Sequence, residues 1–411
     1  MRYLKTSIFL ILGIIATALY FINMPSINEE DFVTIEAKAG DQTVFDDVSI
    51  LGRLVNDYTA FYHDNQTTWL ASETSYLDQI DLSHDNEIIA LQKAYPNFVN
   101  SIIFDTSIIS QPNFSNTNEY LVGVYFNDSS NRDPFSSSSP VYDQTHFKVL
   151  DKNANEENEY ILDRENVPGY QYLEIFSIYQ TGADIKVLFT ESLDEGDNLK
   201  LITFNTDSLA YTEETLASRE GDFMPYLKST SYMNDIATNN SHFIVSNVDI
   251  NGSSNEMADT LVNLSDHSLK ELPASENHYM LSNDDRLYEF SVNDTVYSLS
   301  EINTETLETL STVELAPNDS LTLLETESGE LAMSIDDLFY QNSPPSLYLV
   351  NDKLYIIKNN PETNSKSINY EVFNPESGDS LSFGEIHFEN SNTSSDIATY
   401  IESIQNNANA Q

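Results

Sequence analysis

The sequence predicts an all-β protein built from repeated groups of short antiparallel strands. Three observations support this prediction: short runs of β-favouring residues recur along the chain, Asn, Asp or Ser follows many of them, and long helical patterns are missing. Hydrophobic residues make up 40% of the chain, with 24 Tyr and 21 Phe, which is enough to build a core. We therefore expect one large repeat domain.

The N-terminus precedes this domain and has the features of an export signal. Arg2 and Lys5 stand before an apolar run, residues 8–24, that ends at Pro25. About 17 residues at 1.5 Å each would cover roughly 26 Å, close to the ~30 Å thickness of the bilayer core. Because positive residues stay inside, we expect residues 1–7 to be a cytoplasmic stub and residues 8–24 a single transmembrane signal anchor. The body, residues 25–390, is then extracytoplasmic at the cell membrane.

Cleavage of the signal is the alternative. A cut after the small residues Ala16 and Ala18 would leave a shorter apolar segment and release a secreted protein. The chain has no cysteine, so it has no lipid-attachment cysteine and no disulfide, and a large core must supply stability alone.

The body is strongly acidic. The whole chain has 66 Asp plus Glu against 18 Lys plus Arg, a formal net charge of −48. Phosphate binding depends on clustered cations, so the composition argues against nucleic acid as a partner. A solvated acidic surface explains the charge, and diffuse binding of divalent cations or of a cationic partner is the functional alternative.

Two stretches of the body have the same order of strands and turns. In "HYMLSNDDRLYEFSVNDTVYSLSEINTETLETLSTVEL", His278 to Leu315, the turn compositions "SNDD", "ND" and "NTET" separate four β-favouring runs. Ser346 to Phe388 repeats this succession, and "DRLY" at Asp285 matches "DKLY" at Asp352. Although "TETLETL" has helix propensity by itself, the match predicts two strands with a turn at Asn303.

A polar residue after a strand marks the corner of each predicted unit. Asn, Asp and Ser cap turns with their side chains and tolerate left-handed backbone geometry. The chain has only 12 Gly, so these residues take over much of the usual role of glycine. The predicted markers are Asp151, Asn205, Ser265, Asn303 and Asn374.

These recurrences resemble those of β-propellers in general, with the quinoprotein-like and related bacterial propellers the most similar. The resemblance covers roughly residues 30–390 and implies a single propeller of six or seven four-stranded blades. No "WD" dipeptide, kelch double glycine or aspartate box assigns a particular family. Strand and turn patterns of this kind also occur in other all-β folds, and a sandwich or barrel is the alternative.

The last residues, 391–411, are predicted to form a helix and a tail. In "SDIATYIESIQ", Ile397, Tyr400, Ile401 and Ile404 would share one helical face. We expect this helix to dock on the domain, with a partner-binding helix as the alternative.

The sequence provides no catalytic, cofactor or metal motif. Its seven His residues form no HExxH or other close ligand pair, and GxSxG, GxxxxGK[ST] and GxGxxG are missing. "NVDINGSSNE" places Asp249, Asn251, Ser253 and Asn255 as alternating oxygen donors, but its spacing differs from that of an EF-hand. A tight turn explains it better, as it does "LDEGDN" at Leu193. We predict no catalytic residue, no metal site and no cofactor.

A non-enzymatic binding, sensor or accessory protein at the cell surface is therefore the leading functional hypothesis. Its partners would be the membrane, through residues 8–24, and a protein or a cell-wall polymer. A surface enzyme that processes glycans or peptides on the same scaffold is the alternative, because 66 carboxylates could supply a catalytic pair. A purely structural acidic surface protein is the third possibility.

Overall fold

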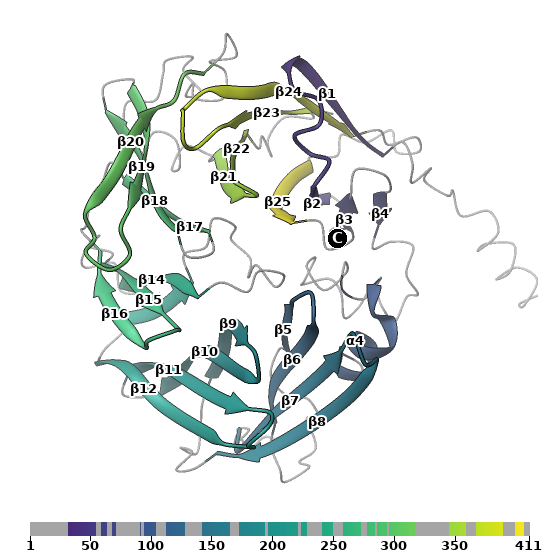
Figure 1. The fold of residues 1–411 in the computed structure, drawn as a ribbon, viewed down its shortest axis with the longest axis vertical. Coiled ribbons are helices and arrows are strands. Elements are labelled where there is room, and N and C mark those ends of the chain that lie inside the picture. The colour runs from purple at the N-terminus through teal and green to yellow at the C-terminus, as the bar shows by residue number, and fades with distance from the viewer. Residues whose placement is uncertain are drawn as a thin grey trace, which may run out of the picture.

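The chain folds into antiparallel sheets arranged around a common centre, as a computed structural model shows (Figure 1). The all-β prediction and the resemblance to β-propellers are confirmed. The structure describes residues 32–54, 59–63, 68–70, 91, 94–103, 112–127, 142–164, 172–193, 196–220, 223–227, 241–249, 258–272, 278–283, 286–293, 296–317, 345–358, 367–388 and 399–406.

The described residues form six sheets, which we number as blades 1 to 6 in chain order. Blade 1 contains β25 (Thr399–Asn406), β2 (Val48–Leu54), β3 (Thr59–His63) and β4 (Thr68–Leu70). Blade 2 contains β5 (Asn113–Asn116), β6 (Tyr120–Asn127), β7 (Gln144–Asp151) and β8 (Glu156–Asp163), and blade 3 contains β9 (Tyr172–Thr181), β10 (Asp184–Leu193), β11 (Gly196–Asn205) and β12 (Tyr211–Glu220).

Blade 4 contains β13 (Phe223–Leu227), β14 (His242–Asp249), β15 (Ala258–Asn263) and β16 (Ser268–Glu271), and blade 5 contains β17 (His278–Asn283), β18 (Arg286–Asn293), β19 (Val296–Ile302) and β20 (Thr309–Glu314). Blade 6 has five strands: β21 (Pro345–Val350), β22 (Lys353–Lys358), β23 (Ser367–Phe373), β24 (Ser380–Phe388) and β1 (Val33–Gly40). The second half of the stretch from His278 to Leu315, which contains "TETLETL", thus forms two strands, β19 and β20, as the repeat predicts.

Strands from both ends of the described chain join blades 6 and 1. β1 pairs with β24 as the outer strand of blade 6, and the chain then passes into β2 of blade 1. β25 pairs with β2 and is the inner strand of blade 1. The two ends therefore close the ring twice, once at the outer edge and once at the centre (Figure 1).

The predicted C-terminal helix is wrong, because residues 399–406 form strand β25; Ile397 lies outside the described residues. Ile401 and Ile404 are buried in the cluster between blades 6 and 1. The apolar spacing that fits a helix also fits a strand here, since the β2–β25 pairing shifts register between Leu51 and Gly52. An irregularity of this kind changes the strict alternation of a strand by one residue.

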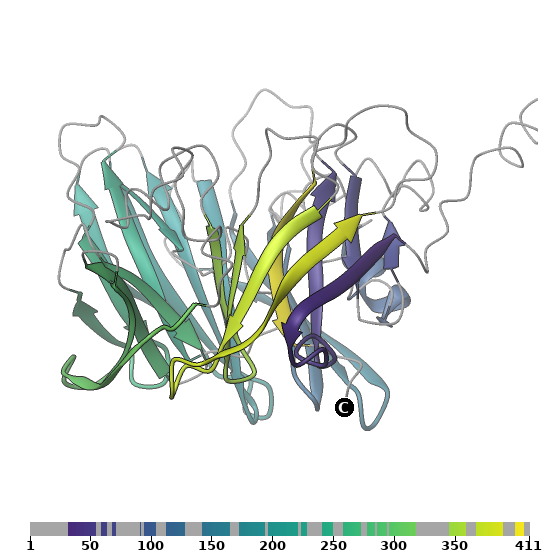
Figure 2. The same ribbon diagram turned by 90° about the horizontal axis from the view of Figure 1, so that it is seen from above.

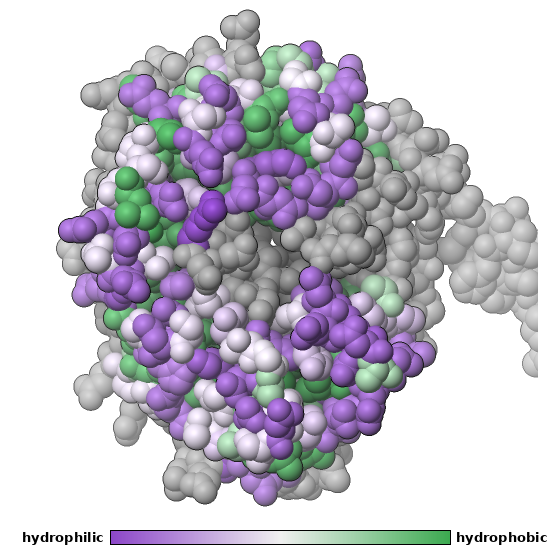
Figure 3. Space-filling model, in the orientation of Figure 1, coloured by the Kyte–Doolittle hydropathy of each residue, from purple (hydrophilic) through white to green (hydrophobic). Residues whose placement is uncertain are grey.

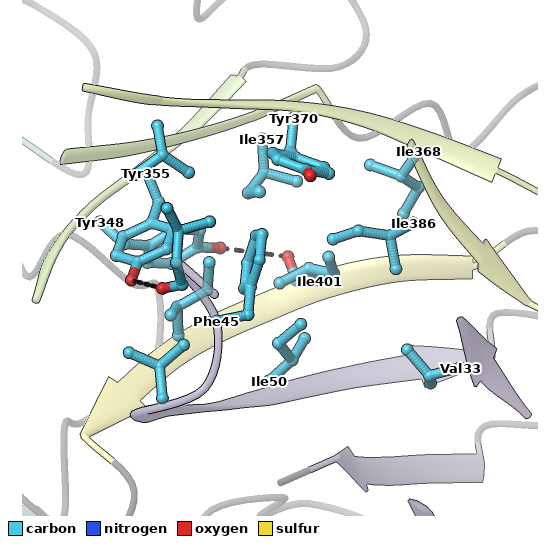
Figure 4. Packing of buried hydrophobic residues seen from close by; sticks show 14 of the residues in the cluster. Val33, Phe45, Ile50, Tyr348, Tyr355, Ile357, Ile368, Tyr370, Ile386 and Ile401 are labelled. Carbon is cyan, nitrogen blue, oxygen red and sulfur yellow. Dashed lines mark hydrogen bonds between the residues drawn. The ribbon is translucent and has the colours of Figure 1, made fainter. Parts of the chain in front are cut away.

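Each neighbouring pair of blades has its own hydrophobic cluster, because the sheets bury side chains on both faces. Figure 4 shows part of the cluster between blades 6 and 1, where Phe45 packs against Tyr355 and Tyr370. Two buried hydroxyls also cross this boundary: Tyr348 donates to the carbonyl of Ile401, and Tyr355 to that of Val44. Aromatic rings thus supply apolar area while their polar ends stay hydrogen-bonded.

A short helix, α4 (Pro96–Ile103), completes the boundary between blades 1 and 2. Phe98, Val99 and Ile102 are buried together with Leu51 of blade 1 and residues of blade 2. The helix lies close to β6, since a Cβ at Gly123 would lie 2.4 Å from the Cδ1 of Ile102.

The turns between the third and fourth strands have one geometry in blades 2 to 6. Each begins with an Asn or Asp whose side chain accepts hydrogen bonds from backbone amides two or three residues later. In each turn the fourth residue after it has a positive φ. The first residues are Asp151, Asn205, Asn263, Asn303 and Asn374, and those with positive φ are Asn155, Leu209, His267, Leu307 and Gly378.

The predicted markers are therefore confirmed in four turns, and in the fifth turn a neighbouring residue is the cap. In blade 4 the capping side chain belongs to Asn263, and Ser265, the predicted marker, donates its amide to it at 2.8 Å. Asn is the stronger cap because its carbonyl oxygen can accept amides two and three residues later in the chain.

Strand direction gives the ring two different rims. The first-to-second strand connections of blades 2 to 6, the third-to-fourth connections of all six blades and the connection from β1 to β2 join strand ends on the rim that carries the capped turns, which we call the turn rim. The remaining connections lie on the opposite rim, which we call the connection rim. β1 begins at Val33 on the connection rim, because Val33 pairs with Phe388 at the end of β24. β25 ends on the turn rim, which is at the bottom of Figure 2.

The predicted anchor, residues 8–24, and the stub, residues 1–7, lie outside the described residues. Within the part of the chain that the structure describes, no helix has the length and apolarity to cross a membrane.

The first prediction concerns Gly384, where β24 approaches β1. A Cβ at this position would lie 2.0 Å from the carbonyl oxygen of Glu36, so Gly384→Ala should detach β1. We expect limited proteolysis of the folded variant to cut within β1, while wild type resists. Gly182→Ala is the control, because its positive φ strains the backbone but its Cβ meets nothing within 4 Å. Equal protection of β1 in Gly384→Ala and wild type would contradict the pairing.

A second prediction concerns the capped turns. Asn303→Ala removes the acceptor of two backbone amides, those of Glu305 and Thr306, each at 2.8 Å. We expect the free energy of unfolding to fall by about 1–2 kcal/mol in urea titrations. Asn303→Asp keeps a side-chain oxygen that can accept these amides, so its free energy of unfolding should fall clearly less. Equal losses of stability in the two variants would show that the hydrogen bonds of the cap contribute nothing.

Candidate functional site

The calcium-like stretches do not form a described metal site. Asp249 ends β14, and residues 250–257 lie outside the described residues. "LDEGDN" lies at the hairpin between β10 and β11, in which Leu193 pairs with Gly196. Among the described residues, no group of three His, Asp or Glu side chains is placed to hold a metal ion.

The most concentrated group of charges lies between blades 2 and 3. Arg164 follows β8 of blade 2, and its guanidinium donates to Glu191 of β10 at 3.0 Å and to Glu213 of β12 at 2.9 Å. Lys200 of β11 contacts the same two carboxylates at 2.8 and 2.9 Å. The side chains of Arg164 and Glu191 are only 1% and 2% exposed, so this cluster is closed to solvent at its centre.

Further contacts fix the guanidinium of Arg164 in place. It donates to the carbonyl of Tyr142 at 3.0 Å and lies over the rings of Phe126 and Phe189, 5.0 and 5.4 Å from their centroids. A planar guanidinium between aromatic rings, with its donors on carboxylates, holds a charge well inside a protein.

The electrostatics of this cluster keep Arg164 and Glu213 charged. Burial alone would raise the pKa of Glu213, but the hydrogen bonds and positive charges of Arg164 and Lys200 lower that pKa to about 2. Burial alone would lower the pKa of Arg164, yet the hydrogen bond and charge of Glu213 raise it. Because Arg164 and Glu213 stay ionised near neutral pH, they exchange no protons there, and their ion pair joins blades 2 and 3.

Lysines connect other neighbouring blades through the capped turns. Lys186 of blade 3 donates to the carbonyls of Leu264 and Ser265, and Lys270 of blade 4 to those of Thr304 and Glu305. In both cases these are the first and second residues after the capping Asn. The cap thus orients two carbonyls toward the ammonium of the preceding blade.

Similar contacts join blade 6 to the β1–β2 connection and blade 5 to blade 6, and a further pair joins blades 3 and 4. Lys353 of blade 6 contacts Asp47, in the connection between β1 and β2, at 3.0 Å, and Arg286 of blade 5 contacts Asp352 of blade 6 at 3.2 Å. His267, in the capped turn of blade 4, pairs with Glu214 of blade 3. The few cations of this acidic chain are thus placed repeatedly at blade boundaries.

A second histidine lies in a more enclosed position in blade 2. The ring of His146 stacks on Tyr125 with centroids 4.7 Å apart, and its Nδ1 lies 3.6 Å from a carboxylate oxygen of Glu159. Tyr125 donates to the same oxygen at 3.3 Å. His146 is 6% exposed and packs beside the cluster of α4, which indicates a structural role.

Burial raises the pKa of the Glu174 carboxyl, and Glu174 lies on β9, the inner strand of blade 3. Sequence reasoning did not identify Glu174 or the Arg164 cluster, because one carboxylate among 66 Asp and Glu has no distinguishing local pattern. The only available signal is the apolar sequence "YLEIFSI" around Glu174.

Carboxylates are frequent on the outer strands. β8 exposes Glu156, Glu157 and Glu159 on an edge of blade 2, and β12 carries Glu213 and Glu214. Charge on an edge strand opposes sheet-to-sheet association. Figure 3 shows hydrophobic residues in small separate areas among hydrophilic ones, in keeping with a solvated surface.

A third prediction concerns the buried arginine. Arg164→Met removes the positive charge that balances the carboxylates of Glu191 and Glu213 inside the protein. The free energy of unfolding should therefore fall by about 3–5 kcal/mol. Arg286→Met is the matched control, because Arg286 and Asp352 are 44% and 73% exposed and such a pair contributes under about 1 kcal/mol. Similar losses in the two variants, measured by urea unfolding, would refute a special role for the cluster.

A fourth prediction concerns acid. Because the folded pKa of Glu213 is about 2, below its ordinary value of 4.5, its contribution to stability is present above pH 4.5 and is lost as pH falls toward 2. Wild type should therefore lose its stability advantage over Glu213→Gln across this interval, as followed by thermal unfolding. A constant difference between the two proteins from pH 6 to pH 2 would contradict the lowered pKa.

No protein-family model matches the chain, and no curated protein matches it. Among solved structures, the chain is similar to the β-propeller domain of the Trilobed protease from Pyrococcus furiosus, described as having an open velcro topology. The identity is 8% and the TM-score 0.31, over 68% of this chain and 82% of that one.

Two other similar structures are a variant of the Synechocystis apocarotenoid oxygenase (9% identity, TM-score 0.27) and a chimera of that oxygenase with RPE65 (9%, 0.29). The first alignment covers 49% of each chain and the second 51%, so this chain spans about half the length of these proteins. At these TM-scores no activity is transferred, and the β-propeller fold rests on the sheet topology of the chain itself.

Proposed function

We propose that the six sheets form one six-bladed ring that acts as a membrane-anchored, extracytoplasmic binding, sensor or accessory protein without catalytic activity of its own. The observation that carries this proposal is the position of β1. The predicted anchor, residues 8–24, leads within a few residues into Val33, at the outer edge of blade 6. A ring joined in this way to an anchor is held at its periphery, so that a rim of the ring stays accessible to partners.

The roles of the described charges also support binding rather than catalysis. The Arg164 cluster and the turn-binding lysines hold neighbouring blades together, and the His146 stack lies within blade 2. The broad rims and acidic outer strands instead suit contact with an extended partner, either a protein or a cell-wall polymer. We exclude nucleic acid from the proposed partners, because the chain has 18 Lys plus Arg against 66 acidic residues.

Flotation of the full chain with lipid vesicles tests the anchor. Leu12→Lys combined with Ile15→Lys places two charges in the apolar run, each costing about 2.5–3.5 kcal/mol on insertion scales. We expect wild type and the conservative variant Leu12→Ile to float with vesicles and the double lysine variant to stay at the bottom. Flotation of all three, or of none, would contradict a membrane anchor in residues 8–24.

Crosslinking from intact cells tests the binding role. We expect the full chain to crosslink specifically to one protein or to wall polymer, and Gly384→Ala, with β1 detached, to lose that product. Recovery of no specific product would favour the purely structural alternative.

The enzyme alternative rests on Glu174, whose half-buried carboxyl has the raised pKa that general acids use. A screen of glycans and peptides with wild type and Glu174→Gln decides this point. Turnover by wild type that Glu174→Gln abolishes would establish an enzyme and overturn the proposed binding role.

A further inference from the structure

We infer that the ring stands on the bilayer with its connection rim toward the lipid and its turn rim facing away. This inference rests on the proposed function, because it requires the anchor. It assigns an interaction surface to each side: the connection rim faces the membrane, and the turn rim is available to partners outside it.

The entry point of β1 determines the side. Val33 pairs with Phe388 and Gly40 with Ser382, so β1 runs from the connection rim to the turn rim. The chain before Val33 therefore reaches the ring on the connection rim. β25 runs the same way and ends at Asn406, which pairs with Val48 on the turn rim. The two described ends lie on opposite rims (Figure 2).

β1 is held firmly enough to transmit this orientation. Phe32 and Val33 are 0% and 4% exposed, and the ring of Phe32 packs against Phe61 and Phe388 with centroids 5.6 and 6.1 Å apart. On the other face of the strand, Lys38 and His387 contact Glu385, and His387 also contacts Glu36 at 3.3 Å. The first residue of the ring thus has a fixed position.

The length of the intervening chain excludes the reverse orientation. Eight steps separate Met24 from Phe32, and a fully extended chain of that length spans at most about 26–29 Å. β24 alone, with 9 residues, is roughly 31 Å long. To place the turn rim against the lipid, the chain between Met24 and Phe32 would have to run back along the whole blade. Even when fully extended, it is shorter than the blade.

The rim that faces away carries described turns. In blades 2 to 6 the third-to-fourth strand connections on this rim are the five capped turns, and the connection of residues 41–47 lies on the same rim. An outside partner would therefore meet these turns.

Single-cysteine labelling of the full chain tests the inference, because the natural sequence has no cysteine. Val296→Cys, at a position 44% exposed, labels the connection rim of blade 5, and Glu305→Cys labels the turn rim of the same blade. β19 separates them by 7 residues, roughly 23 Å. The probe is energy transfer from each label to acceptors in the headgroups of phosphatidylcholine vesicles.

We expect transfer at residue 296 to exceed that at residue 305 at least about two-fold. Equal transfer at the two positions would indicate a ring lying on its side, and greater transfer at 305 would indicate the reverse orientation; either result overturns the inference while the anchor stands. If neither labelled chain floats with vesicles, the anchor itself fails, and the orientation fails with it.

Discussion

Each blade of this protein depends on its two neighbours, because every sheet buries hydrophobic side chains on both faces. The six hydrophobic clusters correspond to the six blade boundaries, and each draws residues from two adjacent sheets. A sheet at the end of an open array would expose one of its faces to water. Ring closure is therefore a condition for stability, and the chain meets it with strands from both of its described ends.

Electrostatics are organised by the same boundaries. A chain with a net charge of −48 has few cations to place, and the described ones recur where one blade meets the next. Lysine binds carbonyls that a capping Asn has already turned toward it, while arginine holds two carboxylates in a closed site. Surplus carboxylates remain on the outer strands, where they are solvated and oppose association between edges.

The sequence allowed prediction of the β-propeller resemblance and of four turn caps, because strand alternation and Asx turns are local patterns. In blade 4 the prediction chose Ser265 although Asn263 is the capping residue, because both residue types can cap a turn. The C-terminal helix was wrong because Ile401 and Ile404 fit two periodicities, and only the pairing of β25 with β2 selects one. Arg164 and Glu174 could not be recognised, since their environments come from strands that are distant in sequence.

The proposed function follows from how the ring is closed. If β1 is an integral strand of blade 6, it connects the ring directly to the predicted anchor, residues 8–24. The anchored ring then presents its turn rim to partners. Native-state hydrogen exchange, resolved to single strands, tests this closure most directly. The account predicts that the amides of β1 and β25 are protected to the same degree as those of β18, within blade 5. Exchange of either strand at the rate of an unfolded chain, with β18 still protected, would contradict a ring closed by both ends.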